Sequence, residues 1–308
     1  MQHFTNDAVR SLGGPAWLEE RRIAALEEAQ GAELPDTSAE VWRYSLVDDL
    51  DLDDWTPVTD RPDEAPADQV DPVVGSIGDV SAVVVVVDGF VTWVDVSEAA
   101  RAAGVGVGRL FDESDERVRE LLEATEPAEA QDPDLLDLLH RAFAPDPVLV
   151  DVPAGTSLDG PVLVVDWITT SGAAVFGHLI VEVGEDAQAD VVLWQGSTDS
   201  AALGIHRTDL IAGAAGRLSH DLVQDRGDQV WQFARQAVVA GRDATVSATA
   251  AGIGCEYARL RTDCRLVGRG STGKLNAAYL GERAQTLDYR TFQEHEAPDT
   301  TSDLLYLG

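Results

Sequence analysis

The fold is decided by a stretch that alternates strictly between two kinds of residue, Glu256-Tyr257-Ala258-Arg259-Leu260-Arg261-Thr262-Asp263-Cys264-Arg265-Leu266. One face of this stretch takes the small and aliphatic side chains, namely Ala258, Leu260, Thr262, Cys264 and Leu266. The other face takes the charged side chains, namely Arg259, Arg261, Asp263 and Arg265. A period of two, with the charges gathered on one face, predicts a half-buried β-strand.

Similar segments follow one another from Val148 to Gly308, with almost nothing that is typical of a helix. They are short, rich in Val, Ile, Leu and Thr, and closed by Gly, Asp or Ser: Val148–Val152, Pro161–Ile168, Phe176–Val183, Ala189–Gln195, Asp209–Ala212, Gln229–Ala240 and Ala244–Ala250. A spacing of roughly 8–12 residues between turns is typical of an all-β array. A sandwich, a barrel and a β-solenoid all fit this pattern, and periodicity alone does not separate them.

The residues before this array divide into three further regions. Residues 1–47 form a helical arm, because Pro15–Gly31 is amphipathic and is followed by a short segment with Trp42 and Tyr44. Residues 48–79 are an acidic, proline-rich linker by composition. Residues 80–146 combine a hairpin, with Asp88-Gly89 as its two-residue turn, and a helix that opens at Asp132-Pro133-Asp134. Residues 147–308 are the β core.

The charge of the chain is strongly acidic. The sequence has 55 Asp and Glu against 22 Lys and Arg, a formal net charge of −33, and Lys274 is its only lysine. Because 44% of the residues are hydrophobic, we expect a folded protein with a densely hydrated acidic surface, as in a salt-loving cytosol. Nucleic acid is excluded as a partner, since nothing is available to replace the counterions of its phosphates.

The sequence also predicts a cytoplasmic location. Cys255 and Cys264 are too few for a disulfide framework, which suits a reducing compartment. The N-terminal residues carry no signal-peptide pattern. The longest apolar run, Ala82–Val94, is interrupted by Asp88-Gly89 and is too short to cross a bilayer, so no membrane is expected as a partner.

One stretch resembles a nucleotide-binding loop. Gly268–Lys274 has the glycine and lysine spacing of a phosphate-cradling loop, but Leu275 stands where that loop needs Ser or Thr for magnesium. The apolar run that follows is short, whereas a helix should begin there. We therefore favour a turn between two strands over a nucleotide site.

The cysteines and histidines suggest no catalytic centre. Cys264 faces inward with the aliphatic residues and Cys255 faces the other way, so the two thiols do not converge on one metal. The pattern places His178, His206 and His220 in core or half-core positions. His295 is different, because it lies among carboxylates and hydroxyls in Glu294–Ser302, a composition that suits a metal or proton site but equally a turn that caps its own backbone. We favour the turn.

The end of the sequence resembles the SufD/SufB family of iron–sulfur cluster assembly proteins. Thr286–Gly308 contains an Asp, a His-x-Ala-Pro-x-Thr-x-Ser run and a Leu-Tyr-x-Gly end in the family's order. The matching positions are Asp288, His295, Ala297, Pro298, Thr300, Ser302, Tyr306 and Gly308. An N-terminal motif on Pro35, Glu40, Trp42 and Tyr44, with Asp88-Gly89-Phe90-Val91 after it, is similar to the SufD side of the family. The stretches Val152–Pro161 and Leu179–Ala187 also resemble the family.

The resemblance implies a right-handed parallel β-helix preceded by a small α/β region. It implies a scaffold subunit that is not an enzyme by itself and that pairs with a SufB-like subunit and a SufC-like ATPase. An iron–sulfur cluster would then be bound only within a SufB-containing complex. No residue of this chain is assigned a catalytic, cofactor-binding or metal-binding role, and the motif positions are expected to be structural or to lie at an interface.

Family members continue beyond the Leu-Tyr-x-Gly block with more solenoid, a Cys-Ser-His-Gly type segment and a helical tail that docks the ATPase. A chain that stops at Gly308 is therefore expected to leave the β-helix incomplete at its C-terminal end and to put ATPase docking in doubt. Two other functions stay open on the residues alone. One is a stand-alone β-solenoid enzyme acting on polysaccharide, and the other is a nucleotide-binding module at Gly268–Lys274.

Overall fold

A computed structural model describes residues 1–62, 66–124 and 133–308 and shows two large β-sheets that face each other. Sheet A contains the odd-numbered strands of the core: β5 (Val148–Val152), β7 (Ala173–Val183), β9 (Ala202–Ala212), β11 (Val230–Ala240), β13 (Tyr257–Leu266) and β15 (Thr286–His295). Sheet B contains the even-numbered strands: β6 (Val162–Ile168), β8 (Gln188–Ser197), β10 (Arg217–Asp225), β12 (Thr245–Gly252), β14 (Thr272–Tyr279) and β16 (Thr301–Leu307).

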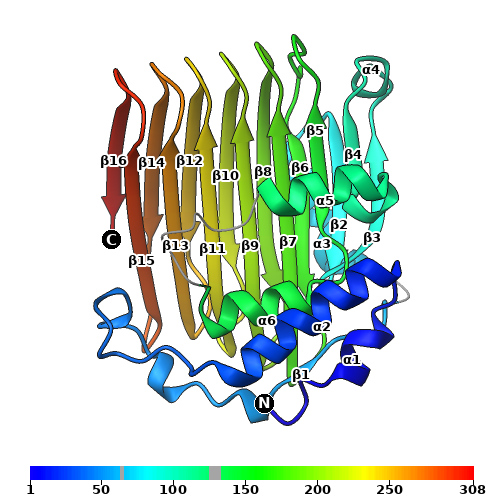
Figure 1. Ribbon diagram of the computed structural model, residues 1–308, viewed down its shortest axis with the longest axis vertical. Helices are drawn as coiled ribbons and strands as arrows, with labels where there is room; N and C mark the ends of the chain where they lie inside the picture. The colour runs from blue at the N-terminus through cyan, green and yellow to red at the C-terminus, as the bar shows by residue number, and fades with distance from the viewer. Residues whose placement is uncertain (63–65, 125–132) are drawn as a thin grey trace.

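Consecutive strands alternate between the sheets, and every pair of neighbouring core strands within a sheet is parallel. Ala173 pairs with Ala202, which pairs with Val230, so a turn takes about 28 residues. The core is thus a parallel β-solenoid of about 6 turns, which confirms the predicted β-helix (Figure 1). The sandwich and the barrel are excluded.

Each sheet contains two further strands besides those of the core. In sheet B, β2 (Ala82–Val87) pairs with β6, and β3 (Phe90–Val96) pairs with β2 as the predicted hairpin. In sheet A, β4 (Gly106–Arg109) pairs with β5, and β1 (Thr56–Pro57) pairs with β7.

The hairpin turn fixes the hairpin onto the solenoid. Asp88 and Gly89 both have positive φ, at 48° and 87°, as a two-residue turn of this kind requires. The buried Asp88 carboxylate accepts hydrogen bonds from the Thr169 and Thr170 hydroxyls at 2.6 and 2.8 Å. The turn therefore joins the start of the fold to the loop after β6.

Between the sheets lies the largest hydrophobic core, built from the inward side chains of both sheets. It includes Leu260, Cys264 and Leu266 of β13, as the alternation predicts. The prediction of a solvated outer face is wrong for this strand, because Arg259 is 3% exposed and Asp263 is 7% exposed. The reason is that the N-terminal part of the chain covers the outer face of sheet A.

Helices cover that outer face (Figure 1). They are α1 (Asn6–Ser11), α2 (Ala16–Gly31), α5 (Asp115–Ala124) and α6 (Leu135–Phe143), with the 3-10 turns η1 (Glu40–Trp42), η2 (Val47–Asp49), η3 (Leu52–Asp54) and η4 (Leu110–Asp112). Helix α6 begins at Asp134, whose side chain accepts from the Asp137 amide as an N-cap. Its apolar face is buried as predicted, whereas Asp132 of the predicted start lies outside the described residues.

The segment 48–79, expected to be a linker, has regular structure. It contains η2, η3 and β1, and its end forms α3 (Ala67–Ile77), which packs on the outer face of sheet B. Val70 and Val73 of α3 are buried against Val85 and Val165. The alternation of aspartates and prolines hides this helix, because Pro72 lies inside it. A short helix, α4 (Glu98–Ala102), follows β3.

Two strand predictions need correction. Strand β9 begins at Ala202, seven residues before the predicted Asp209, and β10 was not predicted as a strand. Among the described residues, no helix is long and apolar enough to cross a membrane.

Candidate functional site at the last turns of the solenoid

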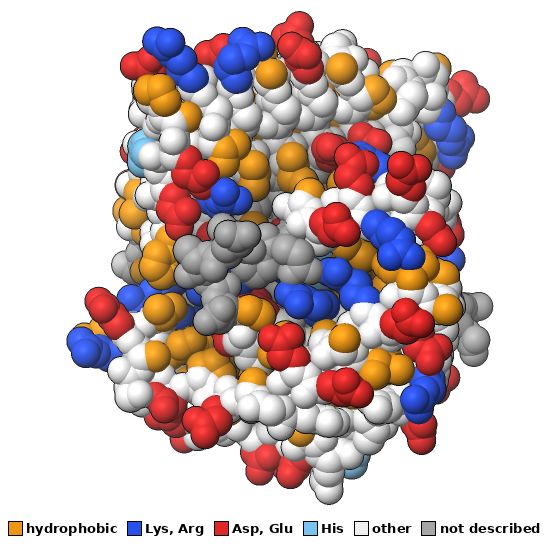
Figure 2. All heavy atoms as spheres, in the orientation of Figure 1, with side chains coloured by type: hydrophobic (Ala, Val, Ile, Leu, Met, Phe, Trp, Pro, Cys, Tyr) orange, Lys and Arg blue, Asp and Glu red, His pale blue; other side chains and the backbone are white. Residues whose placement is uncertain are grey.

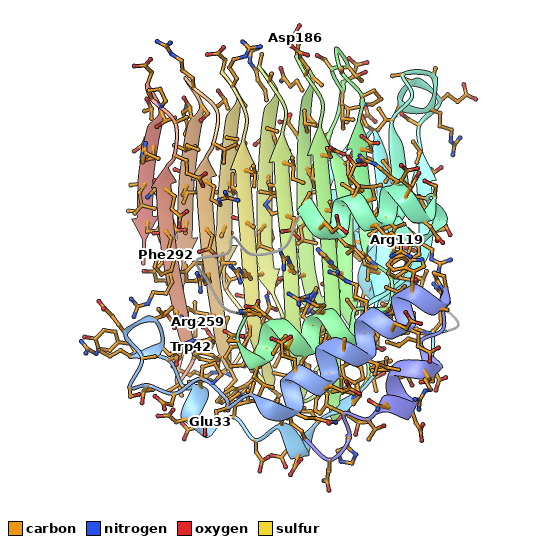
Figure 3. All side chains as sticks on the ribbon, viewed as in Figure 1. Glu33, Trp42, Arg119, Asp186, Arg259 and Phe292 are labelled. Carbon is orange, nitrogen blue, oxygen red and sulfur yellow. The ribbon has the colours of Figure 1, made fainter. Side chains whose placement is uncertain are left out.

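The two sequence motifs, far apart along the chain, meet on the outer face of sheet A. Asp288 lies on β15, whereas Glu40 and Trp42 of the N-terminal motif lie on η1. They are joined by Arg259 of β13, whose guanidinium forms an ion pair with Asp288 and donates a hydrogen bond to the Val41 carbonyl. The same guanidinium lies 4.1 Å from the centroid of the Trp42 ring (Figure 3).

This junction holds the N-terminal arm in place. The Trp42 ring also packs on Phe233 of β11, with 6.1 Å between centroids. A cation over an aromatic face and a buried ion pair to the same guanidinium fix the arm in one position. Sequence reasoning missed Arg259, because alternation places it on the outer face but does not show what covers that face.

The other N-terminal motif residues contribute less. The Glu40 carbonyl accepts from Arg290 at 3.4 Å, and the Tyr44 ring lies 5.9 Å from the same guanidinium. Tyr44 is 76% exposed, so most of its ring is free for contact with another molecule. Pro35 is half-buried ahead of η1.

His295 ends β15 and is held by its own turn. Its Nδ1 lies 2.7 Å from the Thr300 hydroxyl, and its Nε2 lies 3.0 Å from the Ser302 hydroxyl. Because Thr300 Oγ1 donates to the Ala297 carbonyl, it accepts from Nδ1–H, which leaves Nε2 to accept from Ser302. Both ring nitrogens are thus occupied, and the arrangement is that of a capped turn.

The rest of the block shapes the same edge. The Pro298 carbonyl accepts from the Gly270 amide of the turn below, at 3.3 Å. Tyr306 packs edge-on against Tyr289, which stacks on Tyr279 with 4.8 Å between centroids. Gly308 lies against the Tyr279 ring, where an added Cβ would approach a ring carbon to 2.2 Å.

A ladder of basic side chains crosses the outer face of sheet A. Strand register places one basic residue at the same level in five successive turns: His178, Arg207, Arg235, Arg261 and Arg290. Aspartates accompany it, since Arg207 pairs with Asp209 at 2.8 Å and Arg235 pairs with Asp137 of α6 at 2.9 Å. Figure 2 shows arginine side chains gathered in the hollow between the helices, on a molecule whose rim is mostly acidic. Through the pair of Arg235 with Asp137, the ladder also holds helix α6 on the sheet.

The predicted core histidines are buried, and two of them contact aspartates that the sequence did not reveal as their partners. His178 Nε2 lies 2.7 Å from Asp209 Oδ2, and His206 Nδ1 lies 3.0 Å from Asp166 Oδ2. Burial lowers the pKa of both imidazoles, although the carboxylates oppose this. His220 accepts from Gln236 at 3.1 Å, and burial lowers its pKa to about 4.

Arg226 is the centre of a polar network inside the solenoid. It donates to Asp166 at 2.8 Å, to Gln232 at 2.7 Å and to the Gly196 carbonyl at 3.0 Å. Burial alone would raise the pKa of the Asp166 carboxyl, but Arg226 and His206 hold it at about 2. The Asp166 carboxylate is therefore ionised at neutral pH, and its contacts in the network are made by Oδ2, while Oδ1 is buried without a hydrogen-bond partner among the described residues.

Both cysteines are buried, and among the described residues both are free of disulfides. Burial raises the pKa of Cys255 to about 12 and that of Cys264 to about 11, so both are protonated thiols at neutral pH. A thiolate is the form that attacks sulfur or binds iron. Cys255 does not lie on the strand with Cys264, as β13 begins at Tyr257, and its Sγ accepts from Gln224 at 2.8 Å.

The structure also bears on the nucleotide-binding and metal-binding alternatives. Gly268–Ser271 forms a turn, and Lys274 lies on β14, so the helix that a nucleotide-binding loop requires is not formed. Within residues 1–62, 66–124 and 133–308, no group of three or more His, Cys, Asp or Glu is arranged to hold a metal ion.

Two comparisons with known proteins found matches to this chain. The family model described as "SUF system FeS cluster assembly, SufBD core domain" matches residues 167–308, from the end of β6 to the end of the motif block. An iron-sulfur cluster assembly SufBD family protein of Mycobacterium leprae is 28% identical over 137 residues, 44% of this chain and 34% of that protein. One of Mycobacterium tuberculosis is 26% identical over 156 residues, 51% of this chain and 36% of that protein. The aligned part thus spans about a third of each relative. Residues 167–308 of this chain are thus similar to the SufBD core domain.

Proposed function

We propose that this chain is a SufD-like scaffold subunit of an iron–sulfur cluster assembly complex in the cytoplasm. The observation that carries the proposal is that the matched domain coincides with the successive turns of the solenoid and ends on the motif block. The SufD-like N-terminal motif packs on the same turns, through the contact of Trp42 with Arg259. The proposed partners are a SufB-like subunit and a SufC-like ATPase.

The proposed role is structural rather than catalytic. The Asp–Arg and His–Asp pairs are buried and contact each other directly, and His295 is engaged on both nitrogens. The two thiols are protonated at neutral pH because burial raises their pKa. We infer that the chain alone holds no cluster, and that a cluster assembles only when a SufB-like partner supplies ligands.

Co-expression tests this proposal. The chain is produced with a SufB-like and a SufC-like protein from one organism and analysed by size exclusion in high salt. We expect a stable complex that accepts iron and sulfide, whereas the isolated chain stays colourless after the same reconstitution. Recovery of the chain as a monomer beside an intact SufB–SufC complex would overturn the proposal, as would cluster formation on the chain alone.

A further inference from the structure

An apolar row crosses the outer face of sheet B. Strand register places one uncharged, mostly apolar side chain at the same level in seven neighbouring strands, from β2 to β16: Val85, Val165, Trp194, Val223, Ala251, Ala278 and Leu307. In a chain with 55 acidic residues, seven such positions in register form an unusual surface. This row is called the apolar row below.

A helix of the chain itself already packs on one end of the apolar row. Helix α3 packs there, with Val70 and Val73 buried against Val85 and Val165. Trp194 of β8 is partly buried at the edge of the same cluster. This face of the sheet therefore accepts an amphipathic helix mainly by apolar packing, with one hydrogen bond of 3.0 Å from Trp167 Nε1 to Gln69 of α3.

The other end of the row is exposed to solvent in the part of the chain that the structure describes. Val223 and Ala251 are half-buried, Ala278 is exposed, and Leu307 is 59% exposed. The small side chains of Ala251 and Ala278 lie between the larger Trp194 and Leu307. They therefore form the floor of a shallow depression, with a large side chain at each end. Four strand spacings separate those ends, about 19 Å, which is the length of a helix of about 13 residues.

One side of this floor is walled by further apolar residues. Ile253 follows β12 and is 48% exposed, and Leu280 follows β14 and is 67% exposed. Backbone hydrogen bonds place each one turn above the preceding strand end, since Ile253 donates to Gln224 and Leu280 donates to Gly252. Exposed apolar side chains gathered in this way usually mark an interaction surface.

The charged residues beside the apolar row indicate which kind of molecule would bind there. Asp221 and Asp225 flank Val223 on β10, and both are exposed. Asp190 and Asp303 lie farther along the same face, with Lys274 between them in register. A second copy of this chain would bring its own net charge of −33 against these aspartates. A helix with basic residues on its flanks would instead pair with them.

We propose that the apolar row from Trp194 to Leu307 is the docking surface for an amphipathic α-helix with basic flanks, supplied by a partner protein. The partner's helix would lie across the strands, next to the part of the sheet that α3 covers. Strand addition is not the mode of binding, because the backbone groups of these strands are engaged within the sheet.

A labelled synthetic peptide tests the proposal. The probe is an amphipathic helix of about 14 residues, with leucine and alanine on one face and lysine and arginine on its flanks. Its binding to the full chain is followed by fluorescence anisotropy in high salt. Ala251→Glu places a carboxylate on the floor of the row, and we expect it to weaken binding by at least about tenfold.

The matched control is Thr245→Glu. Thr245 lies on the same strand and the same face as Ala251, six residues away, and gives the same change of charge. We expect less than a twofold effect there, and no binding of a scrambled peptide of identical composition. Equal losses in the two variants, equal binding of the scrambled peptide, or no binding by the wild-type chain would overturn the proposal.

Two further measurements address misfolding of the variant and self-association of the chain. Ala278→Glu changes an exposed residue and repeats the result if Ala251→Glu fails to fold, as judged by circular dichroism. Analytical ultracentrifugation of the chain without peptide shows whether a second copy occupies the row. Self-association that Ala251→Glu abolishes and Thr245→Glu preserves would overturn the assignment to a partner helix.

Discussion

Arg226 and Asp166 form an ion pair of 2.8 Å in the interior of the solenoid, 60 residues apart in sequence. The Arg226 side chain is 0% exposed and that of Asp166 is 6% exposed. A charge removed this far from water is stable only when it is paired and hydrogen-bonded. The pair therefore links β6 to the residues after β10 and makes their mutual position a condition of folding.

Removing one partner of this pair should be costly. We expect Asp166→Leu to lower the free energy of unfolding by about 3–5 kcal/mol, because Arg226 is left as an uncompensated buried charge. The double change Asp166→Leu with Arg226→Met should restore much of the loss. Urea denaturation measures both. Asp228→Asn, which breaks the exposed pair with Arg283, is the control and should change little.

The buried histidines should make the fold sensitive to mild acid. Burial lowers the pKa of His220 from 6.5 to about 4, so between these values the unfolded chain binds a proton that the folded chain does not. Stability due to this group is therefore present above pH 6.5 and is lost as the pH falls toward 4. His220→Leu should remove about 1 kcal/mol of the loss of unfolding free energy between pH 7 and pH 5.5.

The effect of Asp134 on the pH dependence of stability should be opposite in sign to that of His220, which provides an internal check. Burial and the nearby Asp137 raise its pKa to about 6, so the folded chain binds the extra proton between pH 3.8 and 6. Asp134→Asn should therefore steepen the loss of stability on acidification, where His220→Leu makes it shallower. Parallel pH curves for the wild type and both variants would contradict the assignment of these groups.

Much of the fold follows from local patterns. The alternation in β13, the Asp88-Gly89 turn and the leucine face of α6 were each sufficient to predict their element. Strand β10 was missed because its inner face includes His220 and its outer face includes Asp221 and Asp225, so neither face is uniform. The helix α3 was missed because its sequence is acidic and contains a proline.

The candidate site was predicted only in part, for a different physical reason. Motif similarity located Asp288 and Trp42, but the residue that joins them, Arg259, belongs to a strand one turn away from Asp288. Partners in a solenoid lie one or more turns apart, so their pairing depends on the register between turns. The same holds for His206 with Asp166 and for His178 with Asp209. Alternation identifies which side chains share a face but not what covers that face.

Arg259 should control the attachment of the N-terminal arm. Arg259→Met removes the partner of Asp288 and the cation over Trp42, and we expect a loss of stability on the order of 3 kcal/mol. Hydrogen exchange of amides in residues 40–45 should accelerate more than exchange in β7. Arg290→Ala is the control, because its guanidinium also contacts the arm but at longer distances, 3.4 Å from the Glu40 carbonyl and 5.9 Å from Tyr44. Equal acceleration in both variants would show that Arg259 has no special role.

The acidic surface should make folding depend on salt. Carboxylates outnumber basic side chains by 55 to 22, and they repel one another across the surface when the Debye length is about 10 Å, as in 0.1 M salt. In 1 M KCl that length falls to about 3 Å, so Tm should rise by several degrees. The contribution of the buried Arg226–Asp166 pair should not change, because burial shields it from ions, and the cost of Asp166→Leu should be the same at both salt concentrations. A Tm that is indifferent to KCl would contradict the interpretation of the charge as a salt-adapted surface, and an equal rise in uncharged osmolyte would attribute the effect to excluded volume.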